Sequence, residues 1–189
     1  MTVHIIYLAA GSSRRFGENK LLYELNGKPI FRHCLDKLSE LNGDIDITVV
    51  SVYNEILDYA KKHGFRSVLG KDSEKGISYS IKSAINSFEN ISQDDYFMFI
   101  VADQPYLSIE SVKKVLNEIR CGAELVCASY GGVSGNPVAF SAKYLTELSE
   151  LSGDKGGKSI INSNLTKCVF VEVSDKNELF DIDIKKNIL

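Results

Sequence analysis

The chain has 189 residues, of which 44% are apolar and 25% are charged, and its formal net charge at pH 7 is −3. This length allows one globular domain with a sizeable core, and the composition excludes a disordered chain and a disulfide-stapled miniprotein. The slightly acidic balance argues against a nucleic-acid-binding polycation. No apolar run reaches the ~20 residues that a membrane-spanning helix needs.

The start of the chain and its cysteines indicate a cytoplasmic protein. Residues 3–10 are mostly apolar, but no basic residue precedes them and they include His4, so we interpret them as a buried strand rather than a secretory signal. The four cysteines form no Cys-x-x-Cys pair and lie far apart, at Cys34, Cys121, Cys127 and Cys168. We therefore expect reduced, mostly buried thiols and no zinc site.

Short apolar runs alternate with helical patterns along the first two thirds of the chain. The run Val3–Leu8 predicts a first buried strand. Pro29 suits the start of a helix with one apolar face, and Gly43 lies just past its end. The same reasoning predicts strands over Ile45–Val52, Phe65–Leu69, Tyr96–Val101 and Leu125–Ala128, and helices over Glu55–Lys62, Ser78–Phe88 and Ile109–Ile119.

The regular alternation of predicted strands and helices ends after Ser129. Tyr130–Asn136 is rich in glycine, Val138–Phe140 predicts a short strand, and Gly153–Gly157 predicts a turn between two helices. The alternation of strands and helices predicts an α/β fold, with a mostly parallel, Rossmann-like sheet flanked by helices. We expect a single domain over residues 1–189, with a nucleotide-binding half (about 1–128) and an acceptor-binding half (about 129–189).

The loop after the first strand has the composition of an anion site. Its small residues leave backbone N–H groups free to face an anion, and residues 1–33 carry five basic side chains against two acidic ones. A nucleoside triphosphate suits such a loop. The loop is not a Walker A motif, because no Ser or Thr follows Lys20, and Gly11 and Gly17 do not have the spacing of a dinucleotide fingerprint. An ordinary basic surface turn is the alternative.

Two acidic segments are candidates for a metal site. Asp103 follows the strand Tyr96–Val101, where a carboxylate is well placed to hold Mg²⁺ against phosphates. A second carboxylate could come from Asp181-Ile182-Asp183, because residues two apart on an extended segment point the same way. The alternatives are a turn-capping role for Asp103 and a solvated acidic face, or a helix cap, near Asp183.

These segments together resemble a known family. Leu8-Ala9-Ala10-Gly11-x-Ser13-x-Arg15-x-Gly17-x-x-Lys20 is similar to the signature of the MobA-like molybdenum cofactor nucleotidyltransferases. It is most similar to their cytidylyltransferase branch, since the guanylyltransferase branch usually has Gly at the position of Ala10. The family's later motifs are matched in order by Gly76-Ile77-Ser78-x-Ser80, Asp103-Gln104-Pro105, Gly135-Asn136-Pro137-Val138, Gly153-Asp154-Lys155-Gly156-Gly157 and Asp181-Ile182-Asp183.

The resemblance implies a glycosyltransferase-A-like fold and a Mg²⁺-dependent reaction. In this reaction CMP passes from CTP to a phosphorylated acceptor, molybdopterin, and pyrophosphate is released. The implied catalytic residues are Lys20, Arg15 and Asp103, and the implied metal ligands are Asp103 and Asp183. The implied nucleotide contacts are Leu8, Ala9, Ala10, Gly11, Ser13, Arg15, Lys20, Ser78, Ser80 and Asp103. The implied acceptor contacts are Gly135, Asn136, Pro137 and Lys155.

Two alternatives to this function stay open. Asn136 stands where the family usually has His, which leaves room for another acceptor, such as a sugar or polyol phosphate, or for another NTP. The chain could also be a non-catalytic nucleotide-binding factor that delivers the cofactor to a molybdoenzyme. Pyrophosphate release separates these readings. We expect no nucleic-acid or membrane partner.

Overall fold

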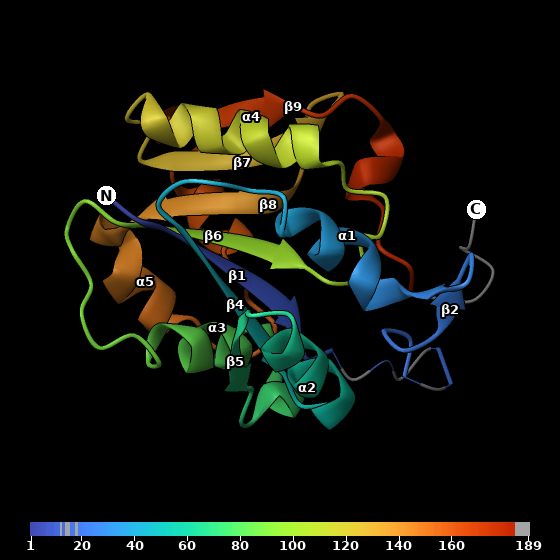
Figure 1. The fold of residues 1–189 in the computed structure, drawn as a ribbon. Coiled ribbons are helices and arrows are strands. Elements are labelled where there is room, and N and C mark those ends of the chain that lie inside the picture. Colours follow the sequence, from blue (N-terminus) through green and yellow to red (C-terminus); the bar gives the residue numbers. More distant parts are fainter. Residues whose placement is uncertain (12, 14–15, 18, 184–189) are drawn as a thin grey trace.

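The computed structural model describes residues 1–11, 13, 16–17 and 19–183. Its main sheet consists of β1 (Val3–Ala9), β4 (Ile45–Ser51), β5 (Arg66–Leu69), β6 (Tyr96–Val101), β7 (Leu125–Tyr130), β8 (Val133–Ser141) and β9 (Cys168–Glu172). These seven strands are arranged in the order β5-β4-β1-β6-β8-β7-β9 (Figure 1). A small second sheet pairs β2 (Glu24–Leu25) with β3 (Lys28–Pro29).

The main sheet is mostly parallel, as predicted. Within the described residues β8 alone runs antiparallel to its neighbours, β6 and β7. The carboxyl ends of β1, β4, β6 and β7 therefore lie at the same edge of the sheet. Because β6 pairs with β8, strands from before and after residue 129 share one sheet, and the division into two halves stays a prediction.

The glycine-rich segment differs from its prediction. The sequence predicted no strand over Tyr130–Asn136, but Tyr130 ends β7 and pairs with Val133 of β8, so the segment forms the tip of a hairpin. Gly131 and Gly132 have positive φ values of 56° and 80°, which is how this tip turns. Strand β9 and the small β2–β3 sheet were not predicted.

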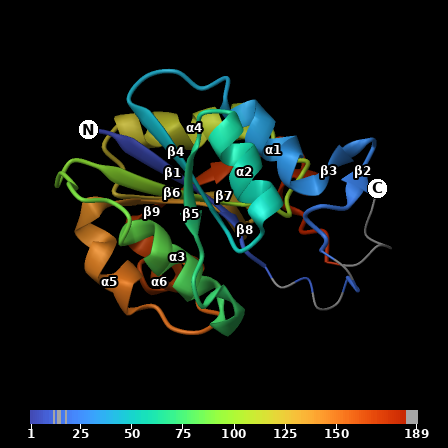
Figure 2. The ribbon, with the colours of Figure 1, turned by 60° about the horizontal axis from the view of Figure 1, so that its bottom comes forward.

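Helices cover both faces of the sheet (Figure 2). One face is covered by α1 (Ile30–Leu38), α2 (Asn54–Lys62) and α4 (Ile109–Arg120). The other face is covered by α3 (Ile77–Ile85), α5 (Leu145–Glu150) and α6 (Lys158–Ser163). The predicted helices are confirmed, although α3 ends at Ile85 rather than at Phe88.

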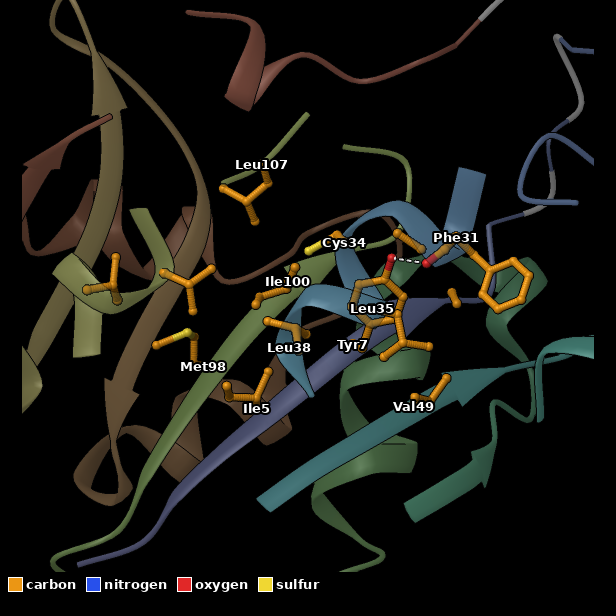
Figure 3. Close-up of a cluster of buried hydrophobic side chains, with 14 of the residues drawn as sticks. Ile5, Tyr7, Phe31, Cys34, Leu35, Leu38, Val49, Met98, Ile100 and Leu107 are labelled. Atoms are coloured by element: carbon orange, nitrogen blue, oxygen red, sulfur yellow. Dashed lines mark hydrogen bonds between the residues drawn. The ribbon is translucent and has the colours of Figure 1, made fainter. Parts of the chain in front are cut away.

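Strand β1 is the centre of the core, since each of its residues is buried. In the cluster beneath α1, the Tyr7 hydroxyl donates a hydrogen bond to the Phe31 carbonyl at 2.7 Å (Figure 3). Burial raises the pKa of Tyr7 well above its usual value, which keeps this donor neutral. The contact fixes α1 on the sheet, so the chain between β1 and α1 is anchored at both ends.

Two further expectations can be compared with the fold. The four cysteines are free thiols, but only Cys34 and Cys127 are buried; Cys168 is half-buried and Cys121 is exposed, so the expectation of mostly buried thiols holds for half of them. Within the described part of the chain, no helix combines the length and the apolar character needed to cross a bilayer.

Candidate active site

A cavity of about 260 Å³ opens at the carboxyl ends of β1 and β6. Among its lining residues are several nucleotide contacts that the sequence predicted, namely Leu8, Ala10, Gly11, Lys20, Ser80 and Asp103. The cavity is also lined by residues that were not predicted, namely Leu21, Ser73, Gly76, Ile77, Val101 and Asp154. The predicted loop and the predicted carboxylate therefore face one space.

The charged centre of the site is Lys20, whose side chain lies between two carboxylates. Its Nζ atom is 2.7 Å from Oδ2 of Asp103 and 3.3 Å from Oδ1 of Asp183. Burial lowers the pKa of Lys20, but the two carboxylates outweigh it and raise the pKa above its usual value. Lys20 is thus a buried, permanent cation at the mouth of the cavity.

The loop after β1 is held by contacts from β4 and from within itself. The Ser51 hydroxyl donates to the Ala9 carbonyl at 2.8 Å, and the Tyr53 hydroxyl donates to the Gly11 carbonyl at 2.9 Å. Further along, the Ser13 hydroxyl accepts a hydrogen bond from the Lys20 backbone N–H at 3.1 Å. These bonds hold Gly11 and Lys20, which line the cavity, in place.

The opposite wall depends on close glycine contacts. The Ser73 hydroxyl lies 2.8 Å from that of Ser80, and it donates to the Gly70 carbonyl at 2.7 Å. Gly76, with φ +128°, packs so tightly against Gly153 that an added Cβ would lie 2.2 Å from the Gly153 carbonyl oxygen. This contact brings Asp154 to the cavity.

The sequence missed Asp154 because the contact that places it joins distant parts of the chain. The available signal was the family-like motif Gly153-Asp154-Lys155-Gly156-Gly157, to which the resemblance assigned no role for Asp154. The Ser78 backbone N–H also donates to the Gly153 carbonyl at 3.2 Å, so the turn is bonded to the start of α3.

Other predicted residues lie outside the cavity lining. Ala9 and Ser78 are fully buried, and the Ser78 hydroxyl finds no hydrogen-bond partner among the described residues. Arg15 lies outside the described residues. The predicted acceptor contacts are on β8 and between α5 and α6, at Gly135, Asn136, Pro137 and Lys155. Their roles stay predictions.

The donor set of the site suits a hard divalent cation. Asp103 and Asp183 point at the same cation, Lys20 Nζ, from two segments far apart in the sequence. The described residues contain no group of three or more His, Cys, Asp or Glu side chains that could enclose a metal by themselves. Two carboxylates completed by substrate phosphates are the usual environment of Mg²⁺, so the residues fit this ion.

A third carboxylate, that of Asp181, lies beside this pair. It accepts a hydrogen bond from Nε2 of Gln104 at 2.8 Å. The loss of water around the Asp181 carboxyl group and the nearby charge of Asp103 raise its pKa to about 6. The two aspartates of the Asp181-Ile182-Asp183 motif thus have different partners, and Asp183 is the one that shares Lys20 with Asp103.

The chain is similar in sequence to a known domain family and to several known proteins. The MobA-like NTP transferase domain family matches residues 5–168. Purine catabolism protein PucB of Bacillus subtilis is 28% identical, over 94% of this chain and 90% of that protein. A probable molybdenum cofactor guanylyltransferase of Pyrococcus horikoshii is 30% identical, over 78% and 72%. A 2-C-methyl-D-erythritol 4-phosphate cytidylyltransferase of Dictyoglomus thermophilum is 29% identical, over 59% and 49%.

The fold has solved counterparts. The structure of Rv0371c from Mycobacterium tuberculosis aligns with a TM-score of 0.80 and 19% identity, over 99% of this chain and 95% of that one. A manganese complex of the same protein aligns with a TM-score of 0.73 and 20% identity, over 92% and 89%. At this identity the likeness concerns the fold.

Proposed function

The chain belongs to the MobA-like NTP transferase family of nucleotidyltransferases, and on this premise we propose that it transfers CMP from CTP to a phosphorylated acceptor, molybdopterin. The observation that carries the proposal is that Lys20 and Asp103 line one cavity and that Asp183 contacts the same Lys20 ammonium group. A cation beside two carboxylates suits the binding of a triphosphate together with Mg²⁺.

The chemistry needs positioning and charge more than a general base. An oxygen of the acceptor phosphate attacks the α-phosphorus of the nucleotide, the bond to the β-phosphate oxygen breaks, and pyrophosphate leaves. The nucleophile is already anionic, so no proton has to be removed from it. Mg²⁺ held by Asp103 and Asp183 would supply charge neutralisation at the phosphates. Lys20 provides a fixed positive charge for the leaving group.

The preference for CTP rests on Ala10, which lines the cavity at the position where the guanylyltransferase branch usually has Gly. Ser73 and Ser80 border the same region. A methyl group at position 10 narrows the space for a base, which favours a pyrimidine over a purine. Some relatives are named as guanylyltransferases, which supports GTP as the nucleotide instead. Guanylyl transfer is therefore the second candidate.

The proposed acceptor follows from the resemblance and the relatives. Gly135, Asn136, Pro137 and Lys155 are the residues that we assign to acceptor binding. The relative named for transfer to a methylerythritol phosphate makes a polyol phosphate the natural comparison substrate.

The test measures pyrophosphate release by the purified protein with Mg²⁺. Each of CTP, GTP, ATP and UTP is combined in turn with molybdopterin and with 2-C-methyl-D-erythritol 4-phosphate. We expect release with CTP and molybdopterin. A preference for GTP would replace the first candidate by the second, and release with the polyol phosphate alone would change the acceptor. Nucleotide binding without release from any pair would contradict the enzyme assignment and favour a cofactor-insertion factor.

A further inference from the structure

The second carboxylate of the site comes from a segment that we call the C-terminal strap (residues 173–183). This segment follows β9 and lies beyond the part of the chain, residues 5–168, that the family matches. The strap begins on β7, where the Val173 backbone N–H donates to the Ser129 carbonyl at 2.9 Å. It ends at Asp183, beside Lys20. Whatever holds the strap therefore sets the position of Asp183.

The middle of the strap is held on α4 by a buried glutamate. Glu178 is 4% exposed, and its Oε2 accepts hydrogen bonds from the Ser108 backbone N–H at 3.0 Å and from the Ser108 hydroxyl at 2.6 Å. Its Oε1 accepts from the backbone N–H groups of Ser174 at 3.1 Å and Asp175 at 3.3 Å. These bonds fold the strap and fix it to the start of α4, away from the charged centre.

The end of the strap is held by Gln104, the residue after Asp103. Its side chain is 2% exposed, and Nε2 donates to the Leu179 carbonyl at 3.1 Å and to Oδ1 of Asp181 at 2.8 Å. Its Oε1 has no hydrogen-bond partner among the described residues, so within them the amide acts as a donor only. Beside it, the backbone N–H of the fully buried Ile182 donates to the Asp103 carbonyl at 3.0 Å.

The strap also touches the half of the domain that we assign to the acceptor. Leu179, whose carbonyl Gln104 binds, packs against Gly135 of β8, where an added Cβ would lie 2.9 Å from Leu179 Cδ1. The strap therefore has β8 on one side and Gln104 on the other.

We infer that Gln104 is a positioning residue: through its bonds to Leu179 and Asp181 it places Asp183 opposite Asp103 at the divalent-cation site. The inference rests on the proposed function, in which these two aspartates hold the metal. One dipeptide, Asp103-Gln104, then supplies the first metal carboxylate and the group that places the second. Residues that orient metal ligands in this way typically change metal affinity by about 10–100-fold when mutated.

The test measures Mn²⁺ binding by electron paramagnetic resonance, in which the signal of free Mn²⁺ falls as the ion binds. The titration uses the full chain with α,β-methylene CTP, which cannot release pyrophosphate. The variants are Gln104→Met, Asp183→Asn and the double variant. Gln93→Met is the matched control, because the other glutamine of the chain is exposed. Thermal unfolding of each variant shows that it is folded.

We expect Gln104→Met to raise the Mn²⁺ dissociation constant about tenfold, and Gln93→Met to leave it unchanged. In the Asp183→Asn background the Gln104→Met change has no further effect, because Gln104 acts through Asp183. Additive effects would overturn the inference. So would a Gln104→Met protein that melts earlier yet binds Mn²⁺ normally, since that is a purely structural role.

The same titration separates this inference from the proposed function. If the wild-type protein releases no pyrophosphate with any acceptor, but the two changes weaken Mn²⁺ binding without adding, the transfer reaction fails and the positioning role of Gln104 stands. If Asp183→Asn leaves Mn²⁺ binding unchanged, Asp183 is not a ligand and the positioning role falls, whatever the turnover.

Discussion

Two clusters with the same arrangement of side chains lie at opposite ends of β1. At the carboxyl end, Lys20 lies between Asp103 and Asp183. At the amino end, His4 lies with Nδ1 3.1 Å from Asp46 and Nε2 3.6 Å from Asp95. Each cluster thus sets one basic side chain between two carboxylates drawn from different segments.

The surroundings of the two clusters differ. The His4 ring lies 4.5 Å from the Phe88 ring and 5.1 Å from the Phe97 ring, between centroids, and the residue is 7% exposed. The Asp95 carboxylate accepts hydrogen bonds from the backbone N–H groups of Thr2 at 2.7 Å and Ser92 at 2.8 Å. The hydrogen bonds of this cluster join the amino ends of β1 and β4 to the segment just before β6.

The cluster at the carboxyl end borders the cavity that the loop after β1 also lines, whereas Asp46 of the amino-end cluster lines a more open cavity at the other edge of the sheet. A basic side chain between two carboxylates therefore does not identify a ligand site by itself. The edge of the sheet at which the cluster lies does identify it, because ligands of open parallel sheets bind at the carboxyl ends of the strands.

The largest effect is expected at the cavity. Asp103→Asn should lower the rate of pyrophosphate release about 10²–10³-fold, because it removes one preorganised charge from the site. The melting temperature should change little, because the aspartate's partner Lys20 keeps Asp183. Steady-state kinetics and thermal unfolding measure the two quantities. A variant that keeps most of its turnover would contradict the role of the carboxylate.

The reverse result is expected at the amino end. Asp95→Ala leaves the backbone N–H groups of Thr2 and Ser92 without their acceptor, and it should lower the free energy of unfolding by about 2 kcal/mol. Turnover should stay within about twofold, because this cluster lies at the other end of β1. Urea unfolding and the same kinetic assay check both expectations. A fall in turnover with unchanged stability would contradict the structural role of the amino-end cluster.

The pH dependence of stability should also follow the amino-end cluster. Burial raises the pKa of Asp95, but the backbone N–H groups of Thr2 and Ser92 outweigh it, and the pKa is lowered overall. The hydrogen bond with His4 lowers the pKa of Asp46. A carboxyl group with a lowered pKa stabilises the fold above its unfolded value, about 3.9 for Asp, and loses this contribution as pH falls.

The measurement compares urea unfolding of the wild-type protein and Asp95→Ala between pH 7 and pH 3. The destabilisation caused by the substitution should shrink toward the acid end. A destabilisation that is independent of pH would assign the loss to packing rather than to charge.

The smallest effect is expected at Asp181, whose pKa has the opposite shift. A raised pKa means that the folded state loses stability as pH rises through about 6, because the charged form is disfavoured there. Asp181→Asn should therefore gain stability at pH 8 relative to pH 4. Since the residue reaches solvent, screening limits the gain to about 0.5–1 kcal/mol. Equal effects at both pH values would contradict the shift.

The sequence predicted the parallel part of the fold because each buried strand there is a short apolar run followed by a helical pattern. It did not predict β9 or the strand residues beside the glycine-rich hairpin tip, because adjacent glycines occur both in tight turns and in irregular segments. Pairing with β7 and β8 is what makes these segments strands.

The site was predicted in part for a similar reason. Lys20 and Asp103 follow strand ends, and strand ends can be located from local patterns. Asp154 reaches the cavity through the contact of Gly76 with Gly153, and Gln104 acts on residues of the strap. Such contacts join residues about 75 positions apart in the sequence and are set by packing, which no local pattern encodes.

The most direct test of the shared site is a crystal structure of the protein with Mn²⁺ and α,β-methylene CTP, in which the anomalous signal locates the ion. We expect one Mn²⁺ bonded to Asp103, Asp183 and the phosphates, with the Lys20 ammonium on the same triphosphate. An ion bound away from Asp103, or a triphosphate out of reach of Lys20, would contradict the claim that Lys20, Asp103 and Asp183 bind one metal–triphosphate ligand.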